Sequence, residues 1–319
     1  VLDDAKRQLT EATGLPADRV LISGTHTHSS VSARWSNPLQ PAKEFTEYQR
    51  FIAHRISDGV RCAINNLQPA RVAWSTVDLP GQVFCRRWLM KPGTELLNPF
   101  GEPDQVKMNP GNSPNLLEPA GPVDPQIAFL ALETLEGRPL GLLANYSLHY
   151  VGGTGPNHIS ADYFGVFADR VQELLGADRQ DPPFVAAMSN GTSGNINNIN
   201  YAVPYPKRQP YEQIRRVADE CAQAVCREYK ALAWQDQARL DMRQRELELA
   251  VRKPTPAQLA HAQKVLSEPE RPDKFPHERS YAQRAIELQN SPDQVRVILQ
   301  AMRIGELGIA AIPFEVFSE

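Results

Sequence analysis

The chain has 319 residues, of which 41% are hydrophobic and 22% are charged, and its formal net charge is −3. This length allows a sizeable buried core, and the composition excludes a disordered chain. The near balance of 34 basic against 37 acidic residues gives no electrostatic basis for nucleic-acid binding. No apolar run reaches about 18 residues, so the sequence predicts no transmembrane segment.

Neither end of the chain looks like a natural terminus. Val1 leads directly into an amphipathic stretch without an initiator Met, and Glu319 follows closely on an apolar strand. We therefore expect a piece of a longer protein, cut at both ends.

The first part of the chain mixes helical and strand patterns. Apolar residues at three- and four-residue spacing predict helices, and short apolar runs predict strands. In chain order we expect a helix at 2–13, a buried strand at 19–23, a long helix at 44–67 and a strand at 70–77. Residues 90–125 are rich in Pro, Gly and Asn and predict a long loop, of the kind that often carries function.

The second part continues in the same way, and Thr255 with Pro256 marks one helix start. The next predicted elements are paired strands at 127–133 and 140–148, a helix at 162–175, a strand at 184–188 and a helix at 209–230. They are followed by an antiparallel strand with one solvent-exposed face at 240–251, helices at 256–267 and 278–289, and a hairpin of 295–304 with 307–312. The fold class is α/β (α+β), with a mixed sheet flanked by helices. No Gly-rich phosphate fingerprint follows a strand, so nucleotide binding is not supported.

The four cysteines, at positions 62, 85, 221 and 226, contain no CxxC pair. Buried free thiols are the favoured interpretation, and a thiolate zinc site is disfavoured.

Ionisable residues follow three of the apolar strands. His26 and His28 follow the strand at 19–23, and their spacing of two puts both imidazoles on one side of an extended chain. His149 ends another strand, and Glu315 follows the last one. Strand ends that lead into loops are common places for catalytic groups.

Histidines at two strand ends and a carboxylate at a third are the kinds of ligand that zinc binds. Zinc binds neutral imidazole nitrogens and carboxylates with three or four ligands, and a catalytic site keeps one position for water. The alternative is that each histidine is a hydrogen-bonded structural residue, because His-x-His alone is a weak signal. His54, His261 and His277 lie on predicted helices or in polar loops, and we expect them on solvated faces.

The segment SNGTSGNINNIN at 189–200 is either a tight turn or a source of donors for a reacting carbonyl. Arg86 follows an apolar strand end and could bind an oxyanion or a carboxylate, with a surface ion pair as the alternative.

Together these segments resemble the neutral/alkaline non-lysosomal ceramidase family, in family order from about residue 20 to the end. The matching segments are ISGTHTHS at 22–29, the Arg86 position, PVDP at 122–125, NYSLH at 145–149, ISAD at 159–162, the GN of 194–195 with Asn198, and AIPFE at 311–315. The resemblance implies a ceramidase-like catalytic domain over 1–319 and, if the protein follows the family, a secreted or periplasmic location.

The resemblance also implies roles. It places Zn²⁺ on His26, His149 and Glu315, with the family's fourth ligand, a Tyr, lying beyond Glu319. His28 and Arg86 would line the pocket and polarise the substrate carbonyl. A set of two histidines and a glutamate is best suited to zinc and also accommodates manganese or iron.

Residues around the expected metal ligands are also assigned roles. Asp162 is expected to orient His149 or His158. Asn197 occupies the position of the family's serine, so it can donate its amide to an oxyanion but cannot act as a nucleophile.

Other departures are Ser30-Val31 in place of Gly-Pro and the absence of the family's immunoglobulin-like domain. These departures leave the three implied metal ligands in place, and they bear on whether the substrate is a ceramide.

The function predicted from the sequence is a zinc-dependent hydrolase that cleaves an N-acyl amide such as a ceramide-like lipid. One alternative is a zinc hydrolase of the same fold that acts on a smaller or more polar amide or ester. The other is a homologue that binds metal or lipid without turnover.

Overall fold

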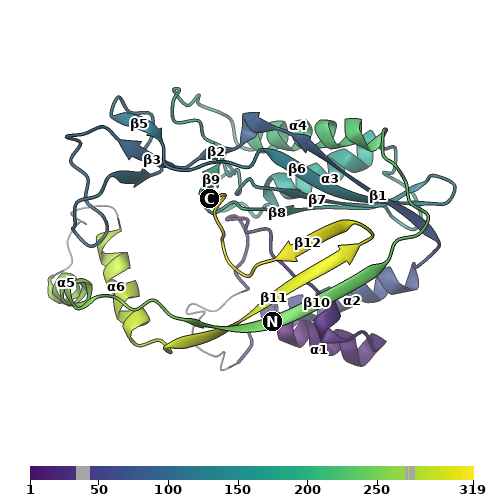
Figure 1. Ribbon diagram of the computed structural model, residues 1–319, viewed down its shortest axis with the longest axis horizontal. Helices are drawn as coiled ribbons and strands as arrows, with labels where there is room; N and C mark the ends of the chain where they lie inside the picture. The colour runs from purple at the N-terminus through teal and green to yellow at the C-terminus, as the bar shows by residue number, and fades with distance from the viewer. Residues whose placement is uncertain (34–43, 270–271, 273–276) are drawn as a thin grey trace.

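The computed structural model describes residues 1–33, 44–269, 272 and 277–319. A four-stranded sheet in the order β1-β6-β7-β8 forms its centre (Figure 1). These strands are β1 (Ala70–Asp78), β6 (Gln126–Thr134), β7 (Pro139–Tyr146) and β8 (Val185–Asn190). The first three run antiparallel, and β7 and β8 run parallel. The predicted class, a mixed sheet flanked by helices, is confirmed.

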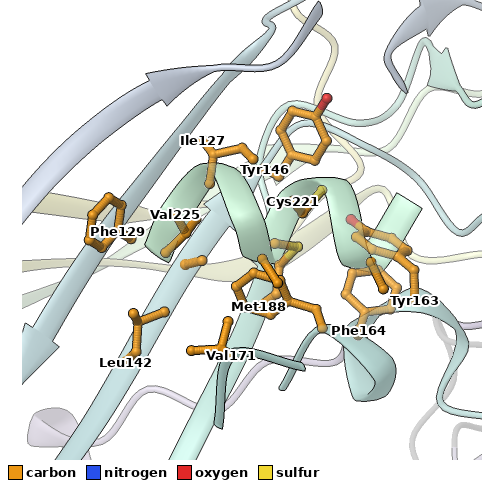
Figure 2. Packing of buried hydrophobic residues seen from close by; sticks show 14 of the residues in the cluster. Ile127, Phe129, Leu142, Tyr146, Tyr163, Phe164, Val171, Met188, Cys221 and Val225 are labelled. Carbon is orange, nitrogen blue, oxygen red and sulfur yellow. The ribbon is translucent and has the colours of Figure 1, made fainter. Parts of the chain in front are cut away.

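Two helices cover one face of this sheet. Helix α3 (Asp162–Leu174) connects β7 to the parallel strand β8, and α4 (Glu212–Tyr229) packs beside it. Alternate residues of β6 and β7, such as Ile127 and Leu142, point toward apolar residues of both helices (Figure 2). Each large apolar side chain that is fully buried contributes about 1.5–3 kcal/mol. This core holds the ends of β7 and β8 in place.

A second sheet carries the end of the chain. It consists of β10 (Leu240–Ala250), β11 (Gln294–Ile304) and β12 (Leu307–Ala311), all antiparallel. A Cβ added to Gly305, in the β11–β12 turn, would lie 3.0 Å from the ring of Trp74 in β1, so the two sheets meet there.

The remaining helices form two pairs. Helix α1 (Leu2–Thr13) packs against α2 (Glu47–Asn65), and α5 (Pro256–Ser267) packs against α6 (Glu278–Gln289). Helix α5 begins at a capping box in which Thr255 accepts from Gln258 N and its own N–H donates to the Gln258 side chain. Within the described residues, no helix is both long enough and apolar enough to cross a bilayer.

The predicted loop at 90–125 is wrong in part, because it contributes to a small sheet. Strand β3 (Arg87–Met90) lies between β4 (Val106–Met108) and β5 (Leu116–Pro119). Pairing satisfies backbone groups that a bare loop would leave to water. A further short pair joins β2 (Phe84–Cys85) to β9 (Ile196–Asn197).

The predicted strand at 19–23 does not form. Ala17–Arg19 is a 3-10 turn, and residues 20–27 have no regular secondary structure. Val20 is extended and buried, but its carbonyl accepts from the side chain of Gln300 instead of from a strand backbone. Of the predicted strand only Val20 is buried, and the segment has no strand partner among the described residues.

The cysteine prediction is confirmed for three residues and wrong for one. Cys85, Cys221 and Cys226 are buried free thiols, whereas Cys62 is exposed. Burial raises the pKa of Cys226 to about 11, so its thiol stays protonated at neutral pH.

Candidate metal centre

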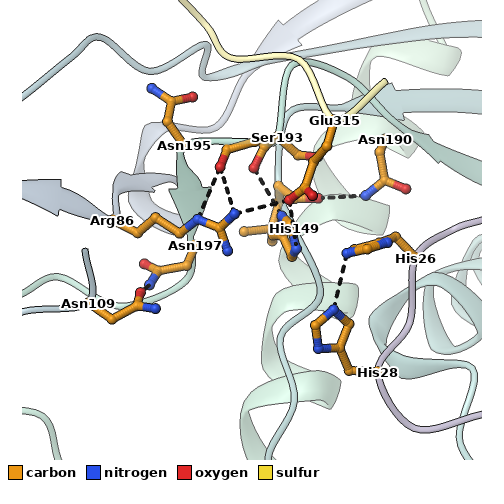
Figure 3. A network of polar contacts seen from close by, with 12 residues as sticks. His26, His28, Arg86, Asn109, His149, Asn190, Ser193, Asn195, Asn197 and Glu315 are labelled. Carbon is orange, nitrogen blue, oxygen red and sulfur yellow. Dashed lines mark hydrogen bonds and ion pairs between the residues drawn. The ribbon is translucent and has the colours of Figure 1, made fainter. Parts of the chain in front are cut away.

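The candidate site lies where β7 and β8 end. His149 follows β7, Ser193 and Gly194 follow β8, Arg86 lies between β2 and β3, and the chain's last residues bring Glu315. Figure 3 shows these groups converging on one place together with His26 and His28.

His149 is the buried member of this group, with 2% of its surface exposed. Its Nδ1 lies 3.0 Å from the carbonyl oxygen of Ser193, which can only accept, so Nδ1 carries the proton. Nε2 is therefore left with a free lone pair. Burial lowers the pKa of His149 and outweighs the opposing effect of the Ser193 hydrogen bond, so the imidazole stays neutral.

His26 and His28 present their nitrogens to each other. Their Nε2 atoms are 3.1 Å apart, and the His28 ring stacks on Tyr150 with centroids 3.8 Å apart. Burial, followed by the charge of His26, lowers the pKa of His28. His26 has a φ of 59°, a left-handed conformation that costs a residue with a side chain about 1–3 kcal/mol.

The His26–His28 segment is fixed to the loop before α3. Ser160 N donates to Ser29 O at 2.8 Å, and the hydroxyls of Thr27 and Ser29 donate back to Ser160 O. Side chains at alternate positions therefore hold the backbone while the two histidines face the site.

Glu315 reaches the site because a glycine allows the end of the chain to approach closely. A Cβ on Gly194 would lie 2.4 Å from the Phe317 ring and 2.5 Å from Glu315 O. Gly194 N donates to Val316 O at 2.8 Å, and Ser318 N donates to the side chain of Asn195 at 3.0 Å. The last residues thus pack directly on the loop after β8.

Arg86 links this loop to the carboxylate. Its Nη2 donates to Gly194 O at 2.6 Å and to Glu315 Oε1 at 3.0 Å, and its side chain is 16% exposed. Glu315 Oε1 also lies 3.4 Å from His149 Nε2. Within the described residues, Nη1 of Arg86 has no hydrogen-bond partner.

The donor set suits a cation. One nitrogen from each of His26, His28 and His149 lies within 4.8 Å of the others. Nitrogens around a tetrahedral zinc at its usual bond length are about 3.3 Å apart. The His149 lone pair also faces a carboxylate oxygen, and two acceptors repel each other unless a cation or proton lies between them. The three histidines could therefore hold a metal ion.

Three predicted residues have other partners. The Asn197 amide nitrogen lies 2.8 Å from Tyr201 Oη and 3.2 Å from Asn109 Oδ1, and Tyr201 Oη itself donates to Asn109 Oδ1. The expected oxyanion donor is therefore hydrogen-bonded to other side chains of the protein. The Ser-to-Asn difference was visible in the sequence, but these partners were not.

Asp162 does not orient an imidazole as expected. Its carboxylate accepts from the backbone N–H groups of Val151, Gly152 and Tyr163 at 2.7–2.9 Å. His158 is exposed, and its Nδ1 lies 2.8 Å from Tyr211 Oη. The expected link from Asp162 to a histidine is thus replaced by a link to the backbone that follows His149.

Two contributors were not foreseen. Tyr150 supports His28 by stacking, and its place directly after His149 was the available signal. The carbonyl of Ser193 sets the protonation of His149, and a backbone carbonyl carries no residue-type signal. His54 and His277 are exposed and His261 is half-buried, so the solvated positions expected for these three are confirmed for two.

No family model matches the sequence. The crystal structure of neutral ceramidase from Pseudomonas aeruginosa matches with a TM-score of 0.50 and 17% identity, over 83% of this chain and 44% of that one. The chain has a ceramidase-like fold. A ceramidase complexed with C2 matches with a TM-score of 0.47 and 17% identity, over 84% of this chain and 45% of that one. The chain thus spans less than half the length of either structure.

Proposed function

We propose that this chain is a metal-dependent hydrolase in which His26, His149 and Glu315 hold zinc. The observation that carries the proposal is the convergence of three imidazoles, with the Glu315 carboxylate 3.4 Å from Nε2 of His149. The ceramidase-like fold supports it at the level of architecture. The proposed substrate is an N-acyl amide of the ceramide-like lipid class.

Zinc in such a site supplies Lewis acidity and makes hydroxide available at neutral pH. The chain's own residues bind and orient the substrate. Arg86 is fixed by Gly194 O and Glu315, so its remaining Nη1 hydrogens can donate to a carbonyl oxygen as negative charge develops there. His28 is exposed and its lowered pKa keeps it neutral, so it can accept a proton from the attacking group and pass it to the leaving amine.

His28 is also the alternative third ligand, because one of its ring nitrogens lies within 4.8 Å of those of His26 and His149. Substitution separates the two roles. A His28→Gln variant that keeps its zinc but loses turnover supports proton transfer, whereas loss of zinc supports ligation.

The engaged amide of Asn197 favours a second candidate, a zinc hydrolase that acts on smaller or more polar amides or esters. The third candidate is a protein that binds metal or lipid without turnover. Hydrolysis of an N-acyl sphingosine should be measured against simple N-acyl amides and esters, with zinc and with a chelator. Chelator-sensitive cleavage of the sphingosine amide is the expected result. Cleavage of only the small substrates supports the second candidate, and no turnover on any substrate contradicts the hydrolase.

A further inference from the structure

One more polar side chain lies beside the candidate metal centre, directly after β4. Asn109 N donates to the carbonyl oxygen of Arg86 at 2.7 Å, so the two residues are held next to each other. Asn109 has a φ of 50°, a left-handed conformation that asparagine adopts more readily than most residues. Figure 3 shows its side chain extending below Arg86 toward the histidines of the site. Asn109 is therefore a neighbour of the group that is proposed to bind the substrate carbonyl.

Hydrogen bonds to its neighbours fix which way the Asn109 amide points. Ile199 N can only donate, and it donates to Asn197 at 2.9 Å, so the atom of Asn197 on that side is Oδ1. Nδ2 of Asn197 then donates to Tyr201 Oη at 2.8 Å and faces Asn109 at 3.2 Å. Because an amide nitrogen cannot accept a hydrogen bond, the Asn109 atom on this side is Oδ1.

Tyr201 supports the same orientation. Its hydroxyl receives the Asn197 amide and donates its own proton to Asn109 Oδ1 at 2.9 Å. Tyr201 is 5% exposed, and burial raises the pKa of its phenol, so the hydroxyl keeps that proton. Oδ1 of Asn109 thus faces two donors from the protein.

The nitrogen of the Asn109 amide is consequently turned away from these neighbours. Among the residues that the structure describes, Nδ2 has no hydrogen-bond partner, and Asn109 is exposed. Fixing an exposed side chain in one orientation costs conformational entropy, which the bonds to Asn197 and Tyr201 offset. The result is a pre-oriented donor next to Arg86. Donors that are fixed before binding lose little freedom when they meet an acceptor.

We infer that Asn109 determines substrate specificity by donating from Nδ2 to an oxygen that lies a few bonds from the scissile carbonyl. The inference deepens the proposed function and rests on it, because Arg86 is there the donor to that carbonyl. Nδ2 can only donate, so the recognised atom is an acceptor such as a hydroxyl or ether oxygen. Amides that carry such an oxygen are preferred to amides with a plain alkyl chain. Asn197 does not touch the substrate and instead orients Asn109.

Binding of ketone analogues tests this role without requiring turnover. In these probes a CH2 group replaces the amide nitrogen, so the protein cannot cleave them, and calorimetric titration of the zinc-incubated chain measures their affinity. One ketone carries an ether oxygen a few carbons from the carbonyl, and its matched partner carries CH2 in that place. A ketone can bind in either direction, so one pair covers an oxygen on either side of the carbonyl. The ether is expected to bind about 2–10-fold more tightly, which corresponds to one hydrogen bond.

Two substitutions isolate the donated hydrogen bond. Asn109→Asp keeps an acceptor oxygen for Tyr201 and tolerates the left-handed backbone, but it has no N–H, so the preference for the ether should disappear. An alcohol of the same shape should still be preferred to CH2 in this variant, because its O–H can donate to the carboxylate. Asn109→Gly removes the side chain at little backbone cost and should abolish both preferences. Asn115→Asp is the control, because this exposed asparagine directly before β5 has no side-chain hydrogen bond among the described residues.

Equal affinity of the parent for the ether and its CH2 partner would overturn the inference, and so would an undiminished ether preference in both Asn109 variants. Zinc content equal to that of the parent confirms that the metal centre is intact in each variant. Failure of the proposed function gives a different result, because the ketones would then bind with the ether preference while N-acyl amides remain uncleaved.

Discussion

Nε2 of His149 lies 3.4 Å from Oε1 of Glu315, although one residue follows β7 and the other lies four positions before the last residue of the chain. The imidazole donates from its Nδ1–H to Ser193 O, so the lone pair of Nε2 faces a carboxylate oxygen of Glu315. A cation or a proton between them removes that repulsion. The candidate metal centre depends on this relationship.

Replacing Glu315 with Gln tests the carboxylate. The amide keeps the size of the side chain and removes the charge, so zinc affinity should fall at least about tenfold. Competitive titration with a chromophoric chelator measures it. Glu319→Gln is the matched control. Glu319 lies in the same C-terminal segment as Glu315, but its Oε1 forms an ion pair with Arg87 Nη1 at 2.6 Å and takes no part in the centre. Equal loss in both variants would contradict a specific role for Glu315.

Gly194→Ala should displace the end of the chain. The added Cβ meets a backbone oxygen and a ring at 2.4–2.5 Å, so one of the two segments must move. We expect a loss of about 1–3 kcal/mol of unfolding free energy and weaker zinc binding. Gly59→Ala is the control: it lies within α2 with nothing near its Cβ, and it should stabilise by about 0.5–1 kcal/mol. Unchanged zinc affinity in Gly194→Ala would show that Glu315 does not need this contact.

The pH dependence of stability follows from His149. Its folded-state pKa lies below the ordinary 6.5, so between these two values the unfolded chain binds more protons. The free energy of unfolding of the metal-free protein should therefore fall as the pH drops below about 6.5, and this contribution should be constant above it. The charges of Arg86 and His26 also lower the pKa of His149, and the charge of Glu315 raises it.

Urea unfolding between about pH 5 and pH 8 measures this effect in the parent and in His149→Gln. The variant should show a shallower decline on the acid side. A parent whose stability rises on acidification through this range would contradict the neutral, buried imidazole.

Asp162→Asn tests how the loop after His149 is held. The carboxylate accepts three backbone N–H groups, and an amide oriented with its nitrogen toward them cannot. We expect a loss of about 1–3 kcal/mol in unfolding free energy and about 10–100-fold weaker zinc binding. Asp169→Asn on the exposed side of α3 is the control. An Asp162→Asn protein that is less stable but binds zinc normally would make this residue purely structural.

The sequence correctly predicted those elements that are determined by interactions between residues near each other in the chain. The Thr255–Pro256 start placed α5 at its observed first residue, and Gly305-Glu306 placed the β11–β12 turn. The strand at 19–23 and the loop at 90–125 were misjudged because strand pairing depends on distant partners. Apolar runs indicate burial and cannot indicate whether a ladder partner is present.

In the candidate site too, some features could be predicted from the sequence and others could not. The residue types at strand ends pointed to His26, His149 and Glu315, which the structure brings together. The partners of Asn197 and Asp162 could not be foreseen, because they come from Asn109, Tyr201 and the backbone of 151–152. Hydrogen bonds to main-chain atoms depend on the folded path of the chain.

Metal content by elemental analysis is the most direct test of the central claim. The chain should be purified alongside His26→Ala and His149→Ala, with His54→Ala as the control because that imidazole is exposed and lies on α2. The account predicts about one zinc per chain, lost in the first two variants and kept in the third. A chain that binds no metal after incubation with zinc, or one whose zinc survives both site substitutions, would contradict it.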